Sequence, residues 1–174
     1  VLHLEPIQGE DARGLVHALV GDALPGKLVD AVAERSGGNA LFIEELLRMW
    51  ASAGVLAHEG DRWVLTAQAD EVPFPPTVQA IYAGQLDDLP GGARTAVRRA
   101  AVAGRRFAVA ALPVLEVDEH EPALDVLGRR GLLAGPTSDP SLGPSYAYRH
   151  ALLRDAGYAS LARAERAKLH LRLA

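Results

Sequence analysis

The residues of this chain that could do chemistry stand in spacings that match no catalytic or metal-binding motif. No pair among the six histidines has the HExxH spacing of a zinc site: His3, His17, His58, His120, His150 and His170. The stretch PGKL at 25–28 lacks the upstream glycine and the hydroxyl residue of a phosphate loop. No serine stands in a nucleophile elbow, and no acidic strand end indicates a magnesium site. We therefore predict no catalytic residues, no metal ligands and no enzyme activity in this segment.

Two kinds of charged cluster have a functional and a structural interpretation. The carboxylates Asp118, Glu119 and Glu121 precede a helical pattern, and we interpret them as the solvated start of a helix. The basic pairs could contact phosphates or could be solvated helix faces and ends: Arg98-Arg99, Arg105-Arg106 and Arg129-Arg130.

Composition limits the class of protein. The 174 residues are 49% apolar and 23% charged, which is typical of a globular chain able to bury a core. The net charge of −4 disfavours a protein built chiefly to hold nucleic acid. The absence of cysteine fits a reducing compartment, and no apolar run is long enough to span a membrane. We expect a cytoplasmic protein without membrane contact. Because the chain begins with Val1 and ends inside a helical pattern, we expect it to be part of a longer protein.

The first part of the sequence predicts three helices and a hairpin. Helices are expected over about 9–20, from about Pro25, and from Ala40 after a loop of small residues. Asn39 is the predicted N-cap of the third helix, because its side chain can accept a hydrogen bond from an otherwise unpaired N–H. A buried stripe is expected on that helix: Phe42, Leu46, Met49, Trp50 and Ala53, widened by Ile43 and Leu47. Residues 55–65 predict a hairpin, and the proline-rich stretch 69–76 predicts a boundary between subdomains.

The second part predicts a different arrangement. Helical patterns run over about 78–89, 92–104, 107–115 and 121–131, and a hairpin with a long Pro/Gly/Ser loop is expected over 132–149. Two further helices are expected over 151–174. The order of three helices followed by a hairpin across 76–149 is that of a winged-helix domain, in which the hairpin is the wing.

Five stretches, taken together and in order, resemble the downstream half of STAND-type AAA+ ATPases. They are ERSGGNALFIEELLRMWASAGVL, PPTVQAIYAGQLDDLP, RRAAVAGRRF, LGRRGLL and YRHALLRDAGYASLARAERAKLHLRLA. These ATPases are large bacterial regulators that carry a LuxR-type DNA-binding domain or an adenylate-cyclase domain. The resemblance covers nearly the whole chain. It implies the last strand of a P-loop core at about residues 1–5.

The resemblance implies a fold that is mainly α with short β-hairpins. Residues 1–72 would form the helical lid subdomain with a small hairpin, and residues 73–150 the winged-helix domain. Residues 151–174 would be helices leading toward tetratricopeptide-like repeats.

The resemblance also implies a nucleotide site completed by the upstream core. Gly38, Asn39 and Ala40 fall where the family has Gly-Asn-Pro, a lid turn that lies against the bound nucleotide. Alanine in place of proline keeps the helix start but loses the ring that would pack on the base. The alternative is a plain capped helix start. The family's Ala-Arg-Leu is replaced by Gly-Gln-Leu at 84–86, which leaves any role of that arginine in doubt.

His150 is the second implied nucleotide contact. In the family, a histidine within a Met-His-Asp motif reaches the phosphates of ADP. Here Arg149 and Ala151 flank the histidine, so only a histidine in a similar context is carried over. The alternatives are that His150 caps its own helix or pairs with Asp155.

We therefore predict a non-catalytic regulatory fragment. It would close over ATP or ADP held by its own upstream P-loop core, and would pass the nucleotide state through a downstream repeat domain to an effector. The fragment itself would hold no cofactor, and the sequence specifies neither effector nor oligomeric state. The alternatives are a winged-helix transcription factor and a structural adaptor. The negative net charge disfavours DNA binding. So do the carboxylates at the start of the third winged-helix helix, because they would repel the phosphates of the DNA backbone.

Overall fold

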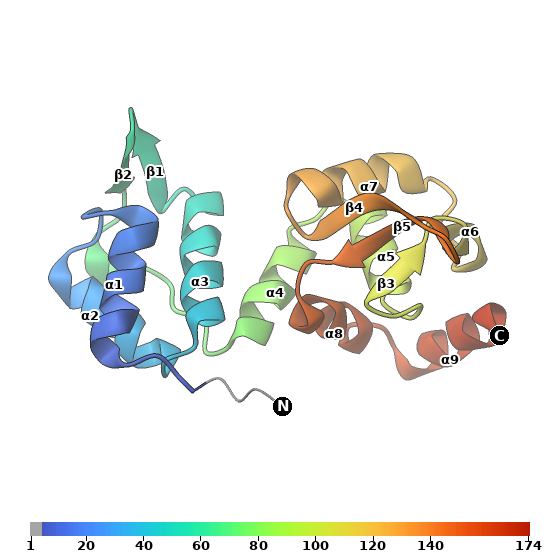
Figure 1. Cartoon of the computed structure of the whole chain (residues 1–174), viewed down its shortest axis with the longest axis horizontal. Coiled ribbons are helices and arrows are strands. Elements are labelled where there is room, and N and C mark those ends of the chain that lie inside the picture. Colours follow the sequence, from blue (N-terminus) through green and yellow to red (C-terminus); the bar gives the residue numbers. More distant parts are fainter. Residues whose placement is uncertain (1–4) are drawn as a thin grey trace. The chain divides into compact units, whose positions relative to one another are not determined.

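The computed structural model describes residues 5–174 (Figure 1). It is mainly helical with two small antiparallel sheets, which confirms the predicted fold class. Contacts divide the chain into two compact units between Ile81 and Tyr82. The strand expected at residues 1–5 falls almost wholly on residues 1–4, outside the described residues, and Glu5 is in neither a helix nor a strand.

The first unit is built from three helices and a hairpin. Its elements are α1 (Gly9–Val20), α2 (Gly26–Ser36), α3 (Ala40–Ser52), β1 (Leu56–Glu59), β2 (Arg62–Leu65) and the short 3-10 helix η1 (Ala69–Glu71). The three α-helices pack against one another. Each contributes fully buried side chains, among them Val16, Val32 and Ile43, so the core of this unit lies where the helices meet.

The start of α3 follows the predicted capping. Asn39 Oδ1 accepts a hydrogen bond from the Phe42 N–H at 3.3 Å, which confirms the N-cap. The predicted stripe is buried at Phe42, Ile43, Leu46, Leu47 and Trp50, but Met49 is half-buried and Ala53 is exposed.

The α3 helix also buries a charge that the sequence did not predict. Glu45 is 1% exposed, and its Oε1 accepts a hydrogen bond from Arg48 Nη1 at 3.0 Å. A buried carboxylate is stable only with polar partners, and Arg48 is one such partner of Glu45.

The proline-rich stretch packs on the first unit. Trp50 Nε1 donates to the Pro73 carbonyl at 2.8 Å, and the Phe74 ring meets the Trp50 ring edge-on with centroids 5.2 Å apart. The Arg35 guanidinium lies 4.3 Å from the centre of the Phe74 ring. These contacts hold the segment against α2 and α3, so the division between the units comes later in the chain, inside α4 (Val78–Asp87). The assignment of 1–72 and 73–150 as functional domains stays a prediction.

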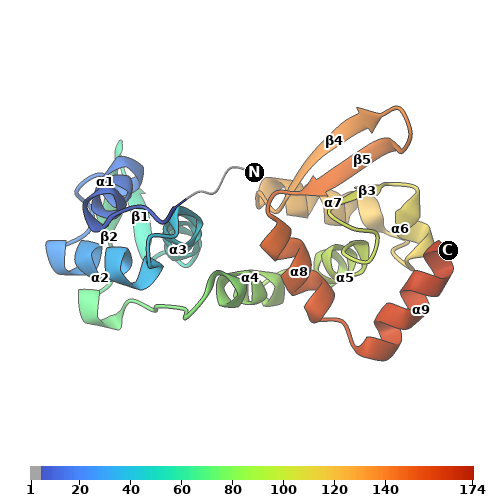
Figure 2. The ribbon, with the colours of Figure 1, turned by 60° about the horizontal axis from the view of Figure 1, so that its bottom comes forward.

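The second unit combines helices with a three-stranded sheet. Beyond α4, its elements are α5 (Gly91–Ala100), β3 (Arg106–Ala108), α6 (Ala111–Val114), α7 (His120–Arg129), β4 (Leu133–Asp139), β5 (Gly143–Tyr148), α8 (Ala151–Ala159) and α9 (Arg163–Leu173). The strand order is β3-β5-β4, and both pairings are antiparallel. The helix α5 packs against α7 and α8 (Figure 2).

The predicted helix over 107–115 is wrong in its first half. Phe107 lies in β3, where it pairs with Tyr146 of β5, and its ring lies 5.9 Å from that of Tyr148. Only Ala111–Val114 is helical. The competing interaction is long-range: pairing with β5 and burial of the ring favour an extended backbone at Phe107.

Tyr148 fixes the end of β5 to α5. Its ring is buried, and its hydroxyl donates a hydrogen bond to the Val97 carbonyl. Burial raises the pKa of Tyr148 far above its ordinary value, because the phenolate would lose its hydration. The hydroxyl therefore remains a donor throughout the neutral and moderately alkaline range.

Within residues 5–174, no helix combines the length and the apolar character that a bilayer crossing requires.

We predict that Leu46→Ala destabilises the protein by roughly 2–5 kcal/mol, because Leu46 is fully buried on α3 and truncation leaves a cavity. Leu19→Ala is the matched control. Leu19 is 40% exposed, and its truncation should change stability by less than about 0.5 kcal/mol. Urea unfolding measures both; equal midpoints for the two variants, with an unchanged slope, would show that the α3 stripe carries no core packing.

Candidate functional site

The turn between α2 and α3 contains the first group of predicted site residues. Gly37 and Gly38 both adopt positive φ, +54° and +77°. Buried Ser36 supports them: its hydroxyl donates to the Ala33 carbonyl at 2.8 Å and accepts from the Gly38 N–H at 3.2 Å. Asn39 then caps α3, and Ala40 is its first residue. Gly38, Asn39 and Ala40 therefore form a turn that is held by side-chain hydrogen bonds from Ser36 and Asn39.

Gly38 is in close contact with the segment that precedes α1. The Ile7 N–H donates to the Gly38 carbonyl at 3.0 Å. A Cβ at position 38 would lie 2.6 Å from both the Ile7 carbonyl oxygen and the Pro6 Cβ. The glycine is thus required by the chain's own packing, which supplies a structural reason for it that is independent of any ligand.

An open depression lies beside this turn. Its volume is about 560 Å³, and it is lined by residues 5–9, Ala33, Gly37 and Gly38. Three of the lining residues are glycines, and Glu5 is the charged one. Such a surface can offer backbone groups to a ligand.

We predict that Gly38→Ala destabilises the first unit more than Gly37→Ala does. Both glycines have positive φ, which costs an alanine roughly 1–2 kcal/mol. Only position 38 adds a clash with backbone atoms, worth about another 1–3 kcal/mol. Urea unfolding gives the two free energies, and amide exchange should show lost protection at Ile7 in Gly38→Ala alone. Equal effects of the two variants would contradict the close contact.

His150, the other predicted site residue, lies in the second unit. It is the N-cap residue of α8, with an extended backbone, but its side chain makes no capping hydrogen bond. The predicted alternative of a self-capping histidine is therefore wrong. The imidazole stacks with the Tyr82 ring, with centroids 6.2 Å apart and planes inclined by 23°. Asp155 Oδ1 accepts a hydrogen bond from Arg154 Nη1 at 3.1 Å.

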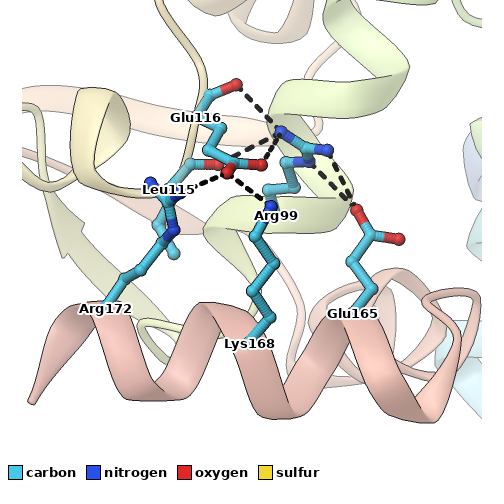
Figure 3. Close-up of polar contacts among 6 residues, drawn as sticks. All are labelled: Arg99, Leu115, Glu116, Glu165, Lys168 and Arg172. Carbon is cyan, nitrogen blue, oxygen red and sulfur yellow. Dashed lines mark hydrogen bonds and ion pairs between the residues drawn. The ribbon is translucent and has the colours of Figure 1, made fainter.

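A cluster of charges around Glu116, which the sequence did not predict, ties α9 to the rest of the second unit (Figure 3). Lys168 Nζ and Arg172 Nη2 lie 2.6 and 2.7 Å from Glu116 Oε1. On the other side, Arg99 Nη1 donates to the Glu116 carbonyl at 3.0 Å and to its Oε2 at 3.2 Å.

Arg99 completes this cluster by joining α5 to α9. Its Nε donates to Glu165 Oε1 at 3.1 Å, so one guanidinium bridges Glu116 and Glu165 (Figure 3). The buried Leu169 supplies the apolar part of the same docking. The helical spacing of Glu165, Lys168 and Arg172 was a signal that these side chains share one face. Their partner Glu116 lies 52 residues before Lys168 in the chain, so no local pattern could identify it.

We predict that Glu116→Gln weakens the dependence of stability on acid pH. The hydrogen bond from Lys168, with the charges of Arg172, Lys168 and Arg99, lowers the pKa of Glu116 below its ordinary 4.5. Because the folded-state pKa is the lower one, the ionised group stabilises the fold above pH 4.5. That stabilisation is lost as the pH falls through the lowered value.

Urea unfolding between pH 6 and pH 2 (roughly the titration range of carboxylates) should therefore show a shallower loss of stability in Glu116→Gln. The control Glu121→Gln changes an exposed carboxylate without an ion pair among the described residues, and should keep the wild-type profile. Identical acid profiles for wild type and Glu116→Gln would show that the cluster does not stabilise the folded state.

The arginines of the three basic pairs differ in whether they have a partner within the chain. Arg98 pairs with Asp87 at 2.8 Å, Arg129 pairs with Asp125, and Arg106 donates to the Thr137 hydroxyl at 3.3 Å. Arg99 belongs to the Glu116 cluster, so most of the basic pairs have partners within the chain. Of the six arginines in these pairs, Arg105 and Arg130 are exposed and have neither an ion pair nor a side-chain hydrogen bond among the described residues.

The carboxylates around the start of α7 are exposed, in agreement with the interpretation of a solvated helix start: Asp118, Glu119 and Glu121. In the part of the chain that the structure describes, no group of three or more His, Asp or Glu side chains is placed to hold a metal ion.

Comparison with known proteins finds little. No family model matches the chain, and no solved structure matches it. Among curated proteins, it is similar to an uncharacterized protein of Rhizobium meliloti (strain 1021), with 32% identity over 184 aligned residues. The match includes 99% of this chain but only 17% of that protein, so the chain spans about a sixth of its relative's length. The relative's name assigns no activity, and the function of this chain has to be argued from its own residues.

Proposed function

We propose that the chain is the lid and winged-helix segment of an ATP-dependent signalling regulator of the STAND-type AAA+ class. It is a non-catalytic segment that closes over ATP or ADP bound to a P-loop core elsewhere in the same protein. Its role is to couple the state of that nucleotide to an effector domain. Cytoplasmic location and contact with a downstream repeat domain belong to the same proposal.

The order of elements in the second unit carries this proposal. Helices α4, α5 and α7 precede the β4–β5 hairpin, and β3 joins the hairpin to form a three-stranded sheet. This is the order expected of a winged helix. The exposed carboxylates at the start of α7, Asp118, Glu119 and Glu121, would repel a phosphate backbone, which favours a winged helix used in protein contact.

The turn before α3 supports the nucleotide part of the proposal. The cap uses Asn39 Oδ1, so the amide nitrogen of the same side chain can donate to a ligand. The Ala40 and Leu41 N–H groups, at the N-terminus of α3, have no hydrogen bond to a described group outside the helix. Such N–H groups and the positive end of the helix dipole attract a phosphate or another anion.

The contribution proposed for His150 is a hydrogen bond to a nucleotide phosphate. A neutral imidazole can donate from one ring nitrogen, and the stacking on Tyr82 restricts the plane of the ring. The proposed role is binding and restraint of the ADP state, without a part in phosphoryl transfer.

We predict that His150→Ala, in the full-length protein that contains this segment, weakens ADP binding by roughly 0.5–1.5 kcal/mol, the usual worth of one hydrogen bond. It should also raise basal effector activity, because the ADP state would be held less firmly. Calorimetry gives the affinity. The matched control is His170→Ala on α9, where the imidazole pairs with the Tyr158 hydroxyl at 2.9 Å and should not affect ADP.

Three outcomes are informative. Equal ADP affinity of wild type and His150→Ala would make His150 a structural residue. A full-length protein that binds neither ATP nor ADP would contradict the proposed function itself. Submicromolar binding of mixed-sequence duplex DNA by this chain, with a steep salt dependence, would instead favour a winged-helix transcription factor.

A further inference from the structure

The strand β2 has one open edge. It pairs with β1 in a two-stranded sheet, and no other described strand joins that sheet. In both views β1 lies between β2 and α3, so the open edge of β2 faces away from α3 (Figures 1 and 2). A strand edge offers a row of N–H and C=O groups to another chain.

The register identifies the groups on that edge. The Thr66 N–H donates to the Val55 carbonyl at 3.0 Å, which marks this opposing pair as hydrogen-bonded. In an antiparallel ladder, hydrogen-bonded and non-hydrogen-bonded pairs alternate, so Val64 and Arg62 also bond to β1. Trp63 and Leu65 therefore direct their N–H and C=O groups away from β1. None of these four groups bonds to a backbone group elsewhere within residues 5–174.

A groove follows the same strand. It has a volume of about 780 Å³, with residues 61–65 on one side and residues 20–23 with Pro25 on the other. Successive side chains of a strand point to opposite faces, so a depression that touches five consecutive residues follows the edge of the strand and not one face. A strand of five residues is roughly 16 Å long, which sets the length of segment that the groove can accept.

The chemistry of the groove restricts its occupant. Val20, Ala23 and Pro25 face Trp63 and Leu65 across it, so apolar side chains can be buried on the inward side. A second, mostly apolar depression of about 430 Å³ is also lined by Val20 and Trp63, together with Leu19, Leu47, Ala51 and Leu56 and with the charged residues Glu44 and Arg48. Because the two depressions share Val20 and Trp63, one large apolar side chain of the occupant can enter the second while its backbone follows β2.

The groove also has a charge preference. Asp22 and Asp61 line it against the one cation Arg62. Asp22 is exposed, and its ion pair is with His17 at 3.3 Å. Two carboxylates against one guanidinium favour an occupant that carries a basic side chain.

We propose that this groove binds an extended peptide segment of a partner protein, which adds to β2 as a third strand. The segment has apolar residues at alternate positions, one of them large, and a basic residue near Asp22 and Asp61. Backbone hydrogen bonds to Trp63 and Leu65 supply affinity, and the apolar depression beyond Trp63 supplies specificity. This interaction surface is independent of nucleotide binding.

The probes for a test are synthetic peptides of the pattern Lys-Val-Thr-X-Thr-Val-Lys, in which X is Ala, Val, Leu or Phe. Titration into the labelled protein, followed by ¹H–¹⁵N NMR, should give saturable shifts. The amide signals of Trp63 and Leu65 should move downfield and gain exchange protection, whereas those of Arg62 and Val64 already have acceptors on β1. Affinity should rise from X = Ala to X = Leu or Phe. Absence of saturable binding across the panel overturns the proposal.

Two variants separate backbone pairing from side-chain contact. Leu65→Pro removes an outward N–H without removing a bond to β1, whereas Leu65→Ala keeps that N–H. Peptide affinity should be lower in Leu65→Pro than in Leu65→Ala by roughly two- to tenfold, the equivalent of one hydrogen bond. Equal affinities, with the Arg62 and Val64 signals showing an intact hairpin in both variants, overturn the proposal.

A second pair of probes tests the same pairing if Leu65→Pro disturbs the hairpin. One peptide is N-methylated at the Val and X positions and the other at the Thr positions. Because the N–H groups of alternate residues point to the same side of a strand, only one of the two peptides loses the N–H groups that face β2. Loss of binding with one pattern and retention with the other supports strand addition; equal binding of both overturns it. The result says nothing about ADP, so its failure would leave the proposed function untouched.

Discussion

The contact between the Gly38 backbone and residues 6–7 is the constraint on which the first unit's candidate site depends. A Cβ at position 38 would lie 2.6 Å from backbone and side-chain atoms of that segment, so any other residue must displace it or distort the turn. Because the contact fixes the path from α2 into α3, it also fixes where Asn39 caps the helix and in which direction the first N–H groups of α3 point. The buried stripe from Phe42 to Trp50 then follows from the helix period.

Two polar anchors of different character hold the second unit. Tyr148 is a buried neutral donor to Val97, and burial keeps it protonated, so this bond is insensitive to salt and to moderate pH. The Glu116 cluster is partly exposed, and water weakens single ion pairs of that kind. Tyr148 links the end of β5 to α5 through its bond to Val97. The docking of α9 combines a network of charges that depends on pH with the burial of Leu169.

Features with local causes were predictable from the sequence. The cap at Asn39, the helix after it, the β1–β2 hairpin and the fold class all follow from neighbouring residues, because capping, helical period and turn chemistry act over a few positions. Phe107 was misassigned because its strand exists only through pairing with Tyr146, far along the chain. Arg99 and Glu165 lie 66 residues apart, and Glu45 is buried by tertiary packing, so no local pattern carried either feature.

The candidate site is subject to the same distinction between local and distant causes. Gly38 and Asn39 have complete structural explanations within the first unit, so their residue types alone are not evidence for a nucleotide. Among residues 5–174, no hydrogen bond from outside α3 occupies the Asn39 amide nitrogen or the N–H groups of Ala40 and Leu41, and these donors suit an anion and no cation. A ligand at this turn would therefore meet the first unit through hydrogen-bond donors. This requirement agrees with the proposed phosphate of a separate core, to which the Ala40 N–H, a group that proline lacks, would be one of the donors.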